Sequence, residues 1–473
     1  MLIASICPMR SPANARAGAL QGAMFARKGL GKIMTSQIVS VENAGSTPRP
    51  TKLHAWYTVG LLTVLFVLSF IDRSILALLA EPVGQSLGLA DRQLALLLGF
   101  GFAVVYSFGG LPLAQLVDTR DRRLVVAVGV GVWSLATVLS AFAVDFWSLL
   151  ILRCGVALGE AVLTPAAVSL IADLFTKERR SLPMSVYLSV GSFMSIGSYT
   201  LGAMAYDLAA GVSSATGLEP WQLTFVLVGL PGLVLGLVFF LTAANPPRGE
   251  SLAIGQDDSS WSAFFSYIRQ RGMFFVPLLT AAGVYSFFAL AVVTWLPTLL
   301  VREEGLSLSR AGYLLGWIGI PAALIGNFLW PQVAMKIDAK WPKRGAVTVL
   351  MIAGCAVGPA FAAGISSGGV VLYVCLAIGI LFGSAFAVMP PIAYQQFGPI
   401  RMRARLAAVN LLVIALLGYG LGPLVAVELG ALIRGGEHSL GVGLVWLSLL
   451  TTPFLILLTF LATRQSRFAE DQD

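Results

Sequence analysis

The stretch SFIDRSILALL, from Ser69 to Leu79, places an aspartate and an arginine side by side in an otherwise apolar run. Between Tyr57 and Leu79, Asp72 and Arg73 are the only charged residues. A helix needs about 20 mostly apolar residues to cross a bilayer, and this run is long enough. We therefore expect a membrane-spanning helix that carries two opposite charges inside the hydrocarbon.

The composition of the whole chain indicates the same environment. Of its 473 residues, 57% are hydrophobic and 11% are charged, whereas a soluble domain has about 25% charged residues. The net charge is +8, but the basic residues fall in short groups between apolar runs. This pattern favours membrane topology over nucleic-acid binding. We expect an all-α membrane protein with a lipid bilayer, and no nucleic acid, as its partner.

Twelve segments are long and apolar enough to span a bilayer, six before the polar stretch 244–272 and six after it. They are 56–79, 94–117, 124–144, 147–171, 182–204, 221–243, 273–300, 313–333, 346–364, 370–391, 406–427 and 442–461. The predicted organisation is a disordered cytoplasmic tail (1–52), an N-terminal six-helix bundle (53–243), a cytoplasmic linker (244–272), a C-terminal six-helix bundle (273–463) and a cytoplasmic tail (464–473).

The positions of the basic residues predict the orientation. Of the 31 Lys and Arg residues, only Arg92, Arg302, Arg310 and Arg434 lie in loops on one side. Arg73 and Arg153 lie inside predicted helices, and all others fall on the opposite side or in the tails. Because Lys and Arg concentrate in cytoplasmic loops, both termini and the linker are predicted to be cytoplasmic.

The loops repeat after six helices. DTRDRR (118–123) follows the second segment and DAKWPKR (338–344) follows the eighth, while LFTKERR (174–180) and QFGPIRMRAR (396–405) follow the fourth and tenth. Matching loops six helices apart predict two parallel six-helix repeats. In the linker, WSAFFSYIRQR (261–271) has the apolar spacing of an amphipathic helix, lying either in the cytoplasmic membrane interface or on the protein's own surface.

Two groups of six helices with an acidic and basic loop after the second and eighth resemble the major facilitator superfamily over about residues 55–463. FIDRSILALLAEPV (70–83) and RCGVALGEAVLTPAAVSLIADLF (153–175) look like its spinster branch, bacterial type. The resemblance implies a secondary transporter that alternates between inward-open and outward-open forms; animal spinster proteins are associated with lysophospholipids and sphingosine phosphate. Ala114 and Thr119 depart from the superfamily loop, which usually has Gly and Arg there.

Four ionisable residues lie well inside the predicted membrane core: Asp72, Arg73, Arg153 and Glu160. From the rise of 1.5 Å per residue, Arg153 reaches the depth of Asp72, and Glu160 lies two turns deeper, within reach of Arg73. We expect an Arg153–Asp72 pair and an Arg73–Glu160 pair. Charges inside a membrane usually serve function, so the four residues are candidates for proton coupling and for binding the substrate's charge. The alternative is a static double salt bridge.

The C-terminal half offers only neutral polar groups inside its helices, and Tyr285, Asn327 and Tyr419 are candidates for the substrate cavity. Ordinary helix packing is the alternative for each. A cavity with one charged wall and one apolar wall suits an amphipathic anion.

A separate set is predicted to act in cytoplasmic gating: Asp118, Arg122, Arg123 and Asp338. Asp118 would meet the positive N-terminal end of the eleventh helix near Leu406, and Asp338 would do the same at the fifth helix. For the arginines, a role as topology signals is equally compatible.

The charged and apolar walls predict a proton-coupled secondary transporter of an amphipathic anion, working as a monomer. The resemblance implies a lysophospholipid or sphingoid-phosphate type of substrate and a bacterial inner membrane. The alternative is a proton symporter of a small organic anion such as a sugar acid. No set of nucleophile, base or metal ligands converges, so we expect no enzyme activity and no cofactor apart from protons as the coupling ion. GISSG (364–368) matches the serine-hydrolase elbow only in letters, because no strand precedes it.

Overall fold

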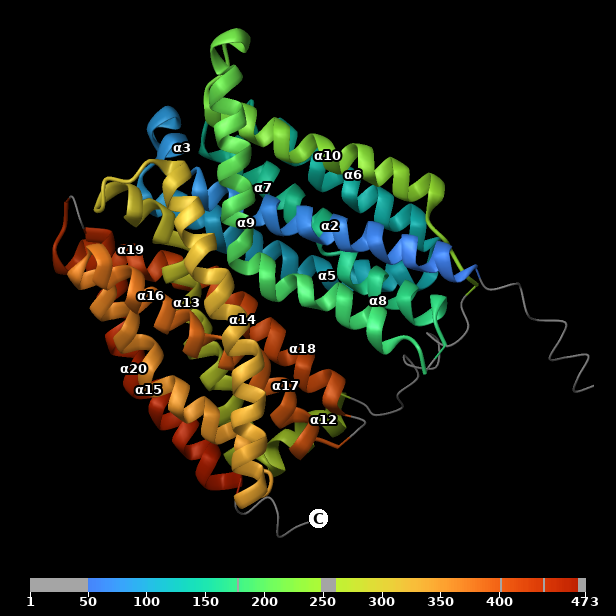
Figure 1. The fold of residues 1–473 in the computed structure, drawn as a ribbon, viewed down its shortest axis with the longest axis vertical. Helices are drawn as coiled ribbons and strands as arrows, with labels where there is room; N and C mark the ends of the chain where they lie inside the picture. The colour runs from blue at the N-terminus through green and yellow to red at the C-terminus, as the bar shows by residue number, and fades with distance from the viewer. Residues whose placement is uncertain (1–49, 177, 248–260, 400–401, 437–438, 467–473) are drawn as a thin grey trace, which may run out of the picture. The chain divides into compact units, whose positions relative to one another are not determined.

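The computed structural model describes residues 50–176, 178–247, 261–399, 402–436 and 439–466. Within these ranges all regular structure is helical (Figure 1). The N-terminal half contains α2 (Lys52–Leu78), α3 (Ala80–Leu87), α4 (Asp91–Ala95), η1 (Leu96–Phe100), α5 (Gly101–Thr119), α6 (Arg122–Ser140), α7 (Phe146–Glu160), α8 (Leu163–Leu174), α9 (Ser181–Thr216) and α10 (Pro220–Thr242). After α12 (Trp261–Gln270), the C-terminal half contains α13 (Gly272–Arg302), α14 (Leu308–Lys340), α15 (Gly345–Ser367), α16 (Gly369–Gly383), α17 (Ala385–Phe397), α18 (Arg403–Val413), η3 (Ile414–Leu421), α19 (Gly422–Ile433) and α20 (Ser439–Ser466).

Eleven of the twelve predicted spans fall on helical segments in the described ranges that are long and apolar enough to cross a membrane. The remaining span is the fifth in the chain, predicted at 182–204. It lies on α9, which is 36 residues long but rich in Ser and Gly and is not among the eleven. The predicted tails and the middle of the linker lie outside the described residues.

Helices of each half pack mainly on one another. In Figure 1 the blue-to-green helices α2 to α10 lie together, as do the yellow-to-red helices α13 to α20. The most extensive contact between the halves is that of α9 with α14, and α5 also packs against η3. We call the end that carries α3 the outer end, after the predicted orientation.

The fourth span is broken beside Glu160. Helix α7 ends at Glu160 and α8 begins at Leu163. Pro165 has no N–H to donate to the carbonyl of Ala161, four residues before it, so the helix cannot continue regularly. The interruption falls immediately after Glu160. The tenth span is also interrupted, between α16 and α17 at Ser384.

The second and eleventh spans each contain a π-helical stretch, and the two stretches are in contact. Gly99 of η1 lies directly against the carbonyl of Tyr419 in η3, where a Cβ atom would overlap it. Only glycine permits this close crossing of the two halves. π-Helical stretches often lie at functional sites, and Tyr419 is one of the predicted cavity residues.

Helix α12 packs on the C-terminal half through one of its aromatic residues. Phe264 is 1% exposed, whereas Phe265 is 62% exposed. The hydroxyl of Tyr267 donates to the carbonyl of Phe397 over 3.2 Å. The linker helix therefore lies on the protein's own surface with one apolar side chain left outward.

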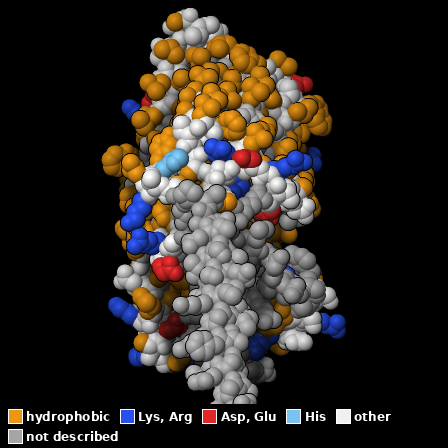
Figure 2. Space-filling model, turned by 90° about the vertical axis from the view of Figure 1, so that its right-hand side faces the viewer, with side chains coloured by type: hydrophobic (Ala, Val, Ile, Leu, Met, Phe, Trp, Pro, Cys, Tyr) orange, Lys and Arg blue, Asp and Glu red, His pale blue; other side chains and the backbone are white. Residues whose placement is uncertain are grey.

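Large apolar side chains are exposed along the outsides of both halves, for example Ile151 (69%), Leu241 (66%) and Phe328 (69%). Figure 2 shows hydrophobic side chains covering the upper part of one face, with Lys and Arg side chains gathered below them. This distribution suits contact with lipid, since no water-soluble surface carries so much exposed apolar area.

Candidate functional site

The four charged residues lie together inside the N-terminal half, on two helices that face each other. Asp72 and Arg73 come from α2, and Arg153 and Glu160 from α7. Asp72 and Arg153 are each 1% exposed and Glu160 is 2% exposed. Two acids and two bases make the set neutral, which lowers the cost of placing it in a medium of low dielectric constant.

Arg73 and Glu160 form the predicted ion pair. Arg73 Nη2 lies 2.7 Å from Glu160 Oε2, and Arg73 Nε lies 3.3 Å from the same oxygen. The two side chains differ in exposure: that of Arg73 is 20% exposed and that of Glu160 is fully buried. Glu160 therefore binds Arg73 from the buried side, while part of the Arg73 side chain remains accessible.

The predicted pair between Arg153 and the Asp72 carboxylate is absent. Arg153 instead donates to main-chain carbonyls of α2, from Nη1 to Asp72 O at 2.9 Å and from Nη2 to Arg73 O at 3.3 Å. The Asp72 carboxylate lies beside Trp133 and Thr137 of α6. The helical rise predicts that Arg153 and Asp72 lie at the same depth, but it does not predict which face of α2 carries the carboxylate.

Several polar atoms around the site have no hydrogen-bond partner in the part of the chain that the structure describes. They are Asp72 Oδ1, Arg153 Nε, Glu160 Oε1 and Trp133 Nε1, all buried. Each such atom costs about 1–3 kcal/mol relative to a satisfied one. The network therefore has hydrogen-bonding capacity beyond the bonds that join α2 to α7.

Three aromatic rings surround the Arg73 guanidinium. Its Cζ lies 4.9 Å from the ring centre of Phe102, 5.1 Å from that of Tyr106 and 5.6 Å from that of Phe70. Rings at this distance attract a cation through their quadrupoles and fix its plane. These rings were not predicted from the sequence. The spacing of Phe102 and Tyr106, one turn apart on one helix, was available in the sequence, but nothing placed that helix beside Arg73.

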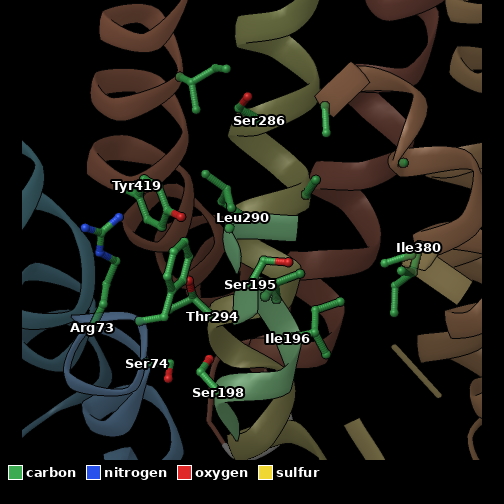
Figure 3. A pocket seen from close by; sticks show the side chains of 18 of the residues that line it. Arg73, Ser74, Ser195, Ile196, Ser198, Ser286, Leu290, Thr294, Ile380 and Tyr419 are labelled. Atoms are coloured by element: carbon green, nitrogen blue, oxygen red, sulfur yellow. The ribbon is translucent and has the colours of Figure 1, made fainter. Parts of the chain in front are cut away.

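A cavity of about 360 Å³ lies between the two halves. Arg73 lines it, and the other three charged residues do not. The predicted cavity residues Tyr285, Asn327 and Tyr419 all line it. Figure 3 shows Arg73 and Tyr419 at one side of the cavity and Ile380 at the other, with Ser195 and Thr294 between them.

The wall contributed by the C-terminal half is largely apolar and aromatic. Tyr285 stacks on Phe386 with ring centres 4.3 Å apart and an interplanar angle of 11°. Phe361 and Ile380 continue the same wall. The cavity thus has one cationic group on the side of the N-terminal half and an apolar surface opposite.

Ion pairs and hydrogen bonds join the halves at the outer end. Arg302 contacts Glu81 at 2.6 Å and Asp91 at 2.8 Å. Arg92 pairs with Glu428 at 2.9 Å. Asp207 of α9 also contacts Ser309 and Tyr313 of α14. Nearer the cavity, the Tyr199 hydroxyl donates to the Val293 carbonyl over 3.0 Å. The two halves are therefore held together at this end.

The predicted gating residues have different surroundings. Asp118 is exposed at the end of α5 and makes no hydrogen bond or ion pair within the described residues. Asp338 contacts its own half rather than α9: Oδ1 accepts from Gly345 N–H at 2.6 Å and Oδ2 from Gln396 Nε2 at 3.2 Å. In the described part of this structure Asp338 makes no contact with α9, because the N-terminus of the neighbouring α15 supplies a nearer donor, and its gating role stays a prediction.

Arg122 is buried in an ion pair that was not predicted from the sequence. Its Nη1 lies 2.5 Å from Asp173 Oδ2, and its Nη2 donates to Pro246 O at 2.6 Å. Arg123 reaches Ala243 O at 3.4 Å. Asp173 was visible as the only acid near the end of the fourth span, but its partner lies 51 residues away in the chain. Arg122 therefore does more than signal topology: it ties α6 and α8 to the start of the linker.

Two helical halves enclose a cavity, and an ion pair inside the membrane has its arginine in the cavity wall and its glutamate buried. A membrane protein of this kind has the architecture of a transporter. The chain belongs to the Major Facilitator Superfamily, whose sequence profile matches residues 62–423. Its fold and its matched relatives are those of transporters, not of enzymes. It is an integral, multi-pass membrane protein.

Among its relatives, the chain is 28% identical over 303 residues to an MFS-type efflux pump of Mycolicibacterium smegmatis, covering 63% of this chain and 67% of the pump. It is 28% identical to protein spinster homolog 3 of Danio rerio (66% of this chain, 63% of that protein) and 25% identical to a probable L-galactonate transporter of Escherichia coli (59% and 62%). The matches to the last two proteins span less than two thirds of their length.

Among solved structures, the chain is similar to a member of the spinster group. A bacterial homologue of the human lysosomal transporter Spinster, in an inward-facing and unoccupied conformation, superposes with a TM-score of 0.76. It is 25% identical and covers 89% of this chain and 99% of that one. The same homologue in an inward-facing, occupied conformation superposes with a TM-score of 0.73 at 24% identity.

Proposed function

We propose that the chain is a proton-coupled secondary transporter of an amphipathic anion, with Arg73 binding the anionic group. The observation that carries the proposal is that Arg73 alone among the buried charges lines the cavity while being held by buried Glu160 at 2.7 Å. An arginine with a planar, aromatic setting suits a phosphate or carboxylate, which it can bind through two N–H groups.

Coupling follows from the shared guanidinium. A proton on Glu160 would neutralise its carboxylate and weaken its hold on Arg73, which then serves the substrate anion. Glu160 Oε1 has no partner in the described residues and offers a place for that proton. Loss of the proton returns Arg73 to Glu160 and releases the anion. Asp72, whose Oδ1 is also unpartnered, is the second candidate for a proton, and Arg153 holds α2 in place beside both.

The lipid-like character of the substrate rests on the apolar wall and on relatives. The wall around Phe361, Ile380 and Phe386 suits a hydrocarbon chain. A relative from Danio rerio, 26% identical over 251 residues, is described as a sphingosine-1-phosphate transporter. Lysophospholipids and sphingoid phosphates combine a compact anionic head with a single chain, which is the pattern of this cavity.

Alternating access would use the two ends of the halves. In a bacterial inner membrane, with twelve spans and both termini cytoplasmic, the Arg302 cluster would lie outside and Asp118 inside. The outer contacts would break, and Asp118 would meet the eleventh span near Leu406, when the site turns outward. The Asp118 side chain makes no hydrogen bond or ion pair within the described residues, and ion pairs join the two halves at the outer end. Both features fit an inward-facing form, which is the conformation named for the matched spinster homologue.

A small organic anion is the second candidate substrate. Two relatives are described as a probable L-galactonate transporter of Escherichia coli and a hexuronate transporter of Bacillus subtilis. The cavity of about 360 Å³ holds such an anion whole, and Arg73 would bind its carboxylate in the same way. The two candidate substrates differ in whether a hydrocarbon chain lies against the apolar wall.

The test is proton uptake by proteoliposomes containing wild-type protein or Glu160→Gln. Lysophospholipids, sphingoid phosphates, galactonate and hexuronates are added in turn. We expect one class to drive proton flux in wild type, and the flux to vanish in Glu160→Gln. Substrate movement that is unchanged by the substitution, with no proton flux in either protein, would instead describe an uncoupled facilitator in which Glu160 is structural.

A further inference from the structure

The apolar wall contains a group of neutral polar side chains at one place, where the tenth span is interrupted. Ser384 lies at the break between α16 and α17. Tyr285 of α13 and Asn327 of α14 line the cavity together with it. None of the three is charged, and the proposed function so far assigns them no role.

Two glycines bring these side chains together. A Cβ atom on Gly383 would lie 2.5 Å from the Tyr285 hydroxyl oxygen, so the phenol lies directly over the backbone beside Ser384. A Cβ atom on Gly326 would overlap Ser384 Oγ, so the backbone next to Asn327 is equally close. The absence of side chains at both positions places the phenol, hydroxyl and amide in one patch.

The patch has hydrogen-bonding capacity that the described protein does not use. Asn327 Oδ1 is buried without a partner, and Tyr285 makes no hydrogen bond within the described residues. The stacking of Tyr285 on Phe386 fixes the phenol ring. The amide is not fixed, and rotation about its terminal torsion, which has a broad preference, presents either its oxygen or its NH₂ group to the cavity. Ser384 Oγ donates to Leu381 O over 2.7 Å and keeps its acceptor sites.

We infer that Tyr285 and Asn327 form a neutral subsite that hydrogen-bonds a hydroxyl or amino group of the substrate, with Ser384 as a further acceptor. The inference rests on the proposed function, since it concerns the same substrate whose anionic group Arg73 binds. The substrate class is then a hydroxylated or aminated anion. Both a phosphorylated lipid with a free hydroxyl and a polyhydroxy acid carry this chemistry.

Recognition of this kind works by exclusion. A site that places unpaired polar groups against a ligand disfavours the analogue that lacks the matching hydroxyl, because the groups then stay unpaired after desolvation. A purely apolar wall would show the opposite preference and bind the analogue with fewer hydroxyls more tightly. The sign of the preference therefore distinguishes the two descriptions.

The test is equilibrium binding to the full chain with two matched pairs of probes. The first pair is gluconate and hexanoate; the second is a lysophosphatidic acid with a free glycerol hydroxyl and its analogue without that hydroxyl. In wild type, we expect the hydroxylated member of at least one pair to bind about tenfold or more tightly. The pair that binds tells whether the source is a small acid or a lipid.

The variants Asn327→Leu and Tyr285→Phe should each reduce that ratio by about three- to tenfold, with the affinity of the deoxy probe unchanged. Tyr394→Phe is the matched control, since its hydroxyl donates to Asn410 over 2.9 Å and it does not line the cavity. Tyr285→Phe removes a single oxygen atom and keeps the test valid if Asn327→Leu does not fold.

Three outcomes separate the claims. A wild-type preference that both variants weaken supports the subsite. Anions that bind through Arg73, shown by loss of binding in Arg73→Ala, but with no hydroxyl preference or one that neither variant alters, overturn the subsite alone. Binding of none of the four probes to wild type, or binding that Arg73→Ala leaves intact, overturns the proposed function and the subsite with it.

Discussion

Arg73 and Glu160 are hydrogen-bonded at 2.7 Å and 3.3 Å, yet they face different surroundings: the arginine lines the cavity and the glutamate is buried behind it. A change in the charge of Glu160 can therefore reach the cavity only through Arg73. A change in what Arg73 binds in the cavity reaches Glu160 by the same route. This arrangement links two events, and linkage of that kind is reciprocal.

Replacing Arg73 with Lys tests how much depends on the guanidinium itself. Lys keeps the charge but loses the planar group that donates from both Nε and Nη2 to Glu160 and lies among Phe102 and Tyr106. We expect initial transport rates to fall about tenfold or more, with little change in thermal stability.

Arg92→Lys is the matched control for that substitution. Arg92 pairs with Glu428 in a mostly exposed setting, where either cation serves nearly as well. Equal transport by Arg73→Lys and wild type would show that only a positive charge is needed in the cavity.

Arg302 is expected to hold the outer end closed. It pairs with two acids of the other half, and its side chain is 34% exposed, so solvent screens the contact. Loss of a partly exposed pair is worth about 1 kcal/mol, or roughly a fivefold shift in population toward the outward-open form. Arg302→Ala should lengthen the distance between spin labels placed at exposed Leu208 and Leu432, measured by electron resonance in a cysteine-free background.

Arg310→Ala controls for that experiment, because Arg310 is exposed near the same end and makes no ion pair in the described residues. High salt should also shift the wild-type distances part of the way, since it screens exposed charges. Identical distance distributions for wild type and Arg302→Ala would remove Arg302 from the gate.

Asp118 and Asp338 occupy repeated loops but should respond differently to substitution. Asp118→Asn removes no contact of this conformation, so thermal stability should stay within about 0.5 kcal/mol of wild type while transport falls, because the outward-facing form loses its proposed contact. Asp338→Asn weakens the bond to Gly345 N–H and should lower stability by about 1 kcal/mol. Normal transport by Asp118→Asn would exclude its gating role.

The sequence predicted most of the fold because each span is decided locally. A run of about 20 apolar residues is enough to define a membrane helix, whatever its neighbours are. The exception is α9, which is rich in Ser and Gly, is not among the eleven apolar spans, and packs along α14 of the other half.

The sequence predicted a contact in the site only where the depth of two residues along their helices was enough to pair them. Arg73 and Glu160 were matched because the helical rise places them within reach. Arg153 was assigned to the wrong acceptor, since a main-chain carbonyl leaves no signature in the sequence. The aromatic rings around Arg73 depend on how two helices are packed, which neither helix encodes alone.

The buried pair of Arg122 and Asp173 gives a prediction about stability. Their side chains are 1% and 2% exposed. Asp173→Ala leaves the guanidinium buried without its counter-charge and should lower the free energy of unfolding by about 3–5 kcal/mol. Arg122→Met should also be destabilising, because the buried Asp173 carboxylate then loses the guanidinium at 2.5 Å.

The double variant Arg122→Met/Asp173→Leu separates the cost of an unpaired charge from the worth of the pair. Apolar side chains of similar volume avoid the desolvation of both ions, so the double variant should be more stable than either single one and close to wild type. Thermal unfolding of the four proteins in the same detergent measures this cycle. A double variant as unstable as the single ones would mean that the bonds from Arg122 to Ser169 and to Pro246 O, rather than the ion pair, hold α6 to α8 and the linker.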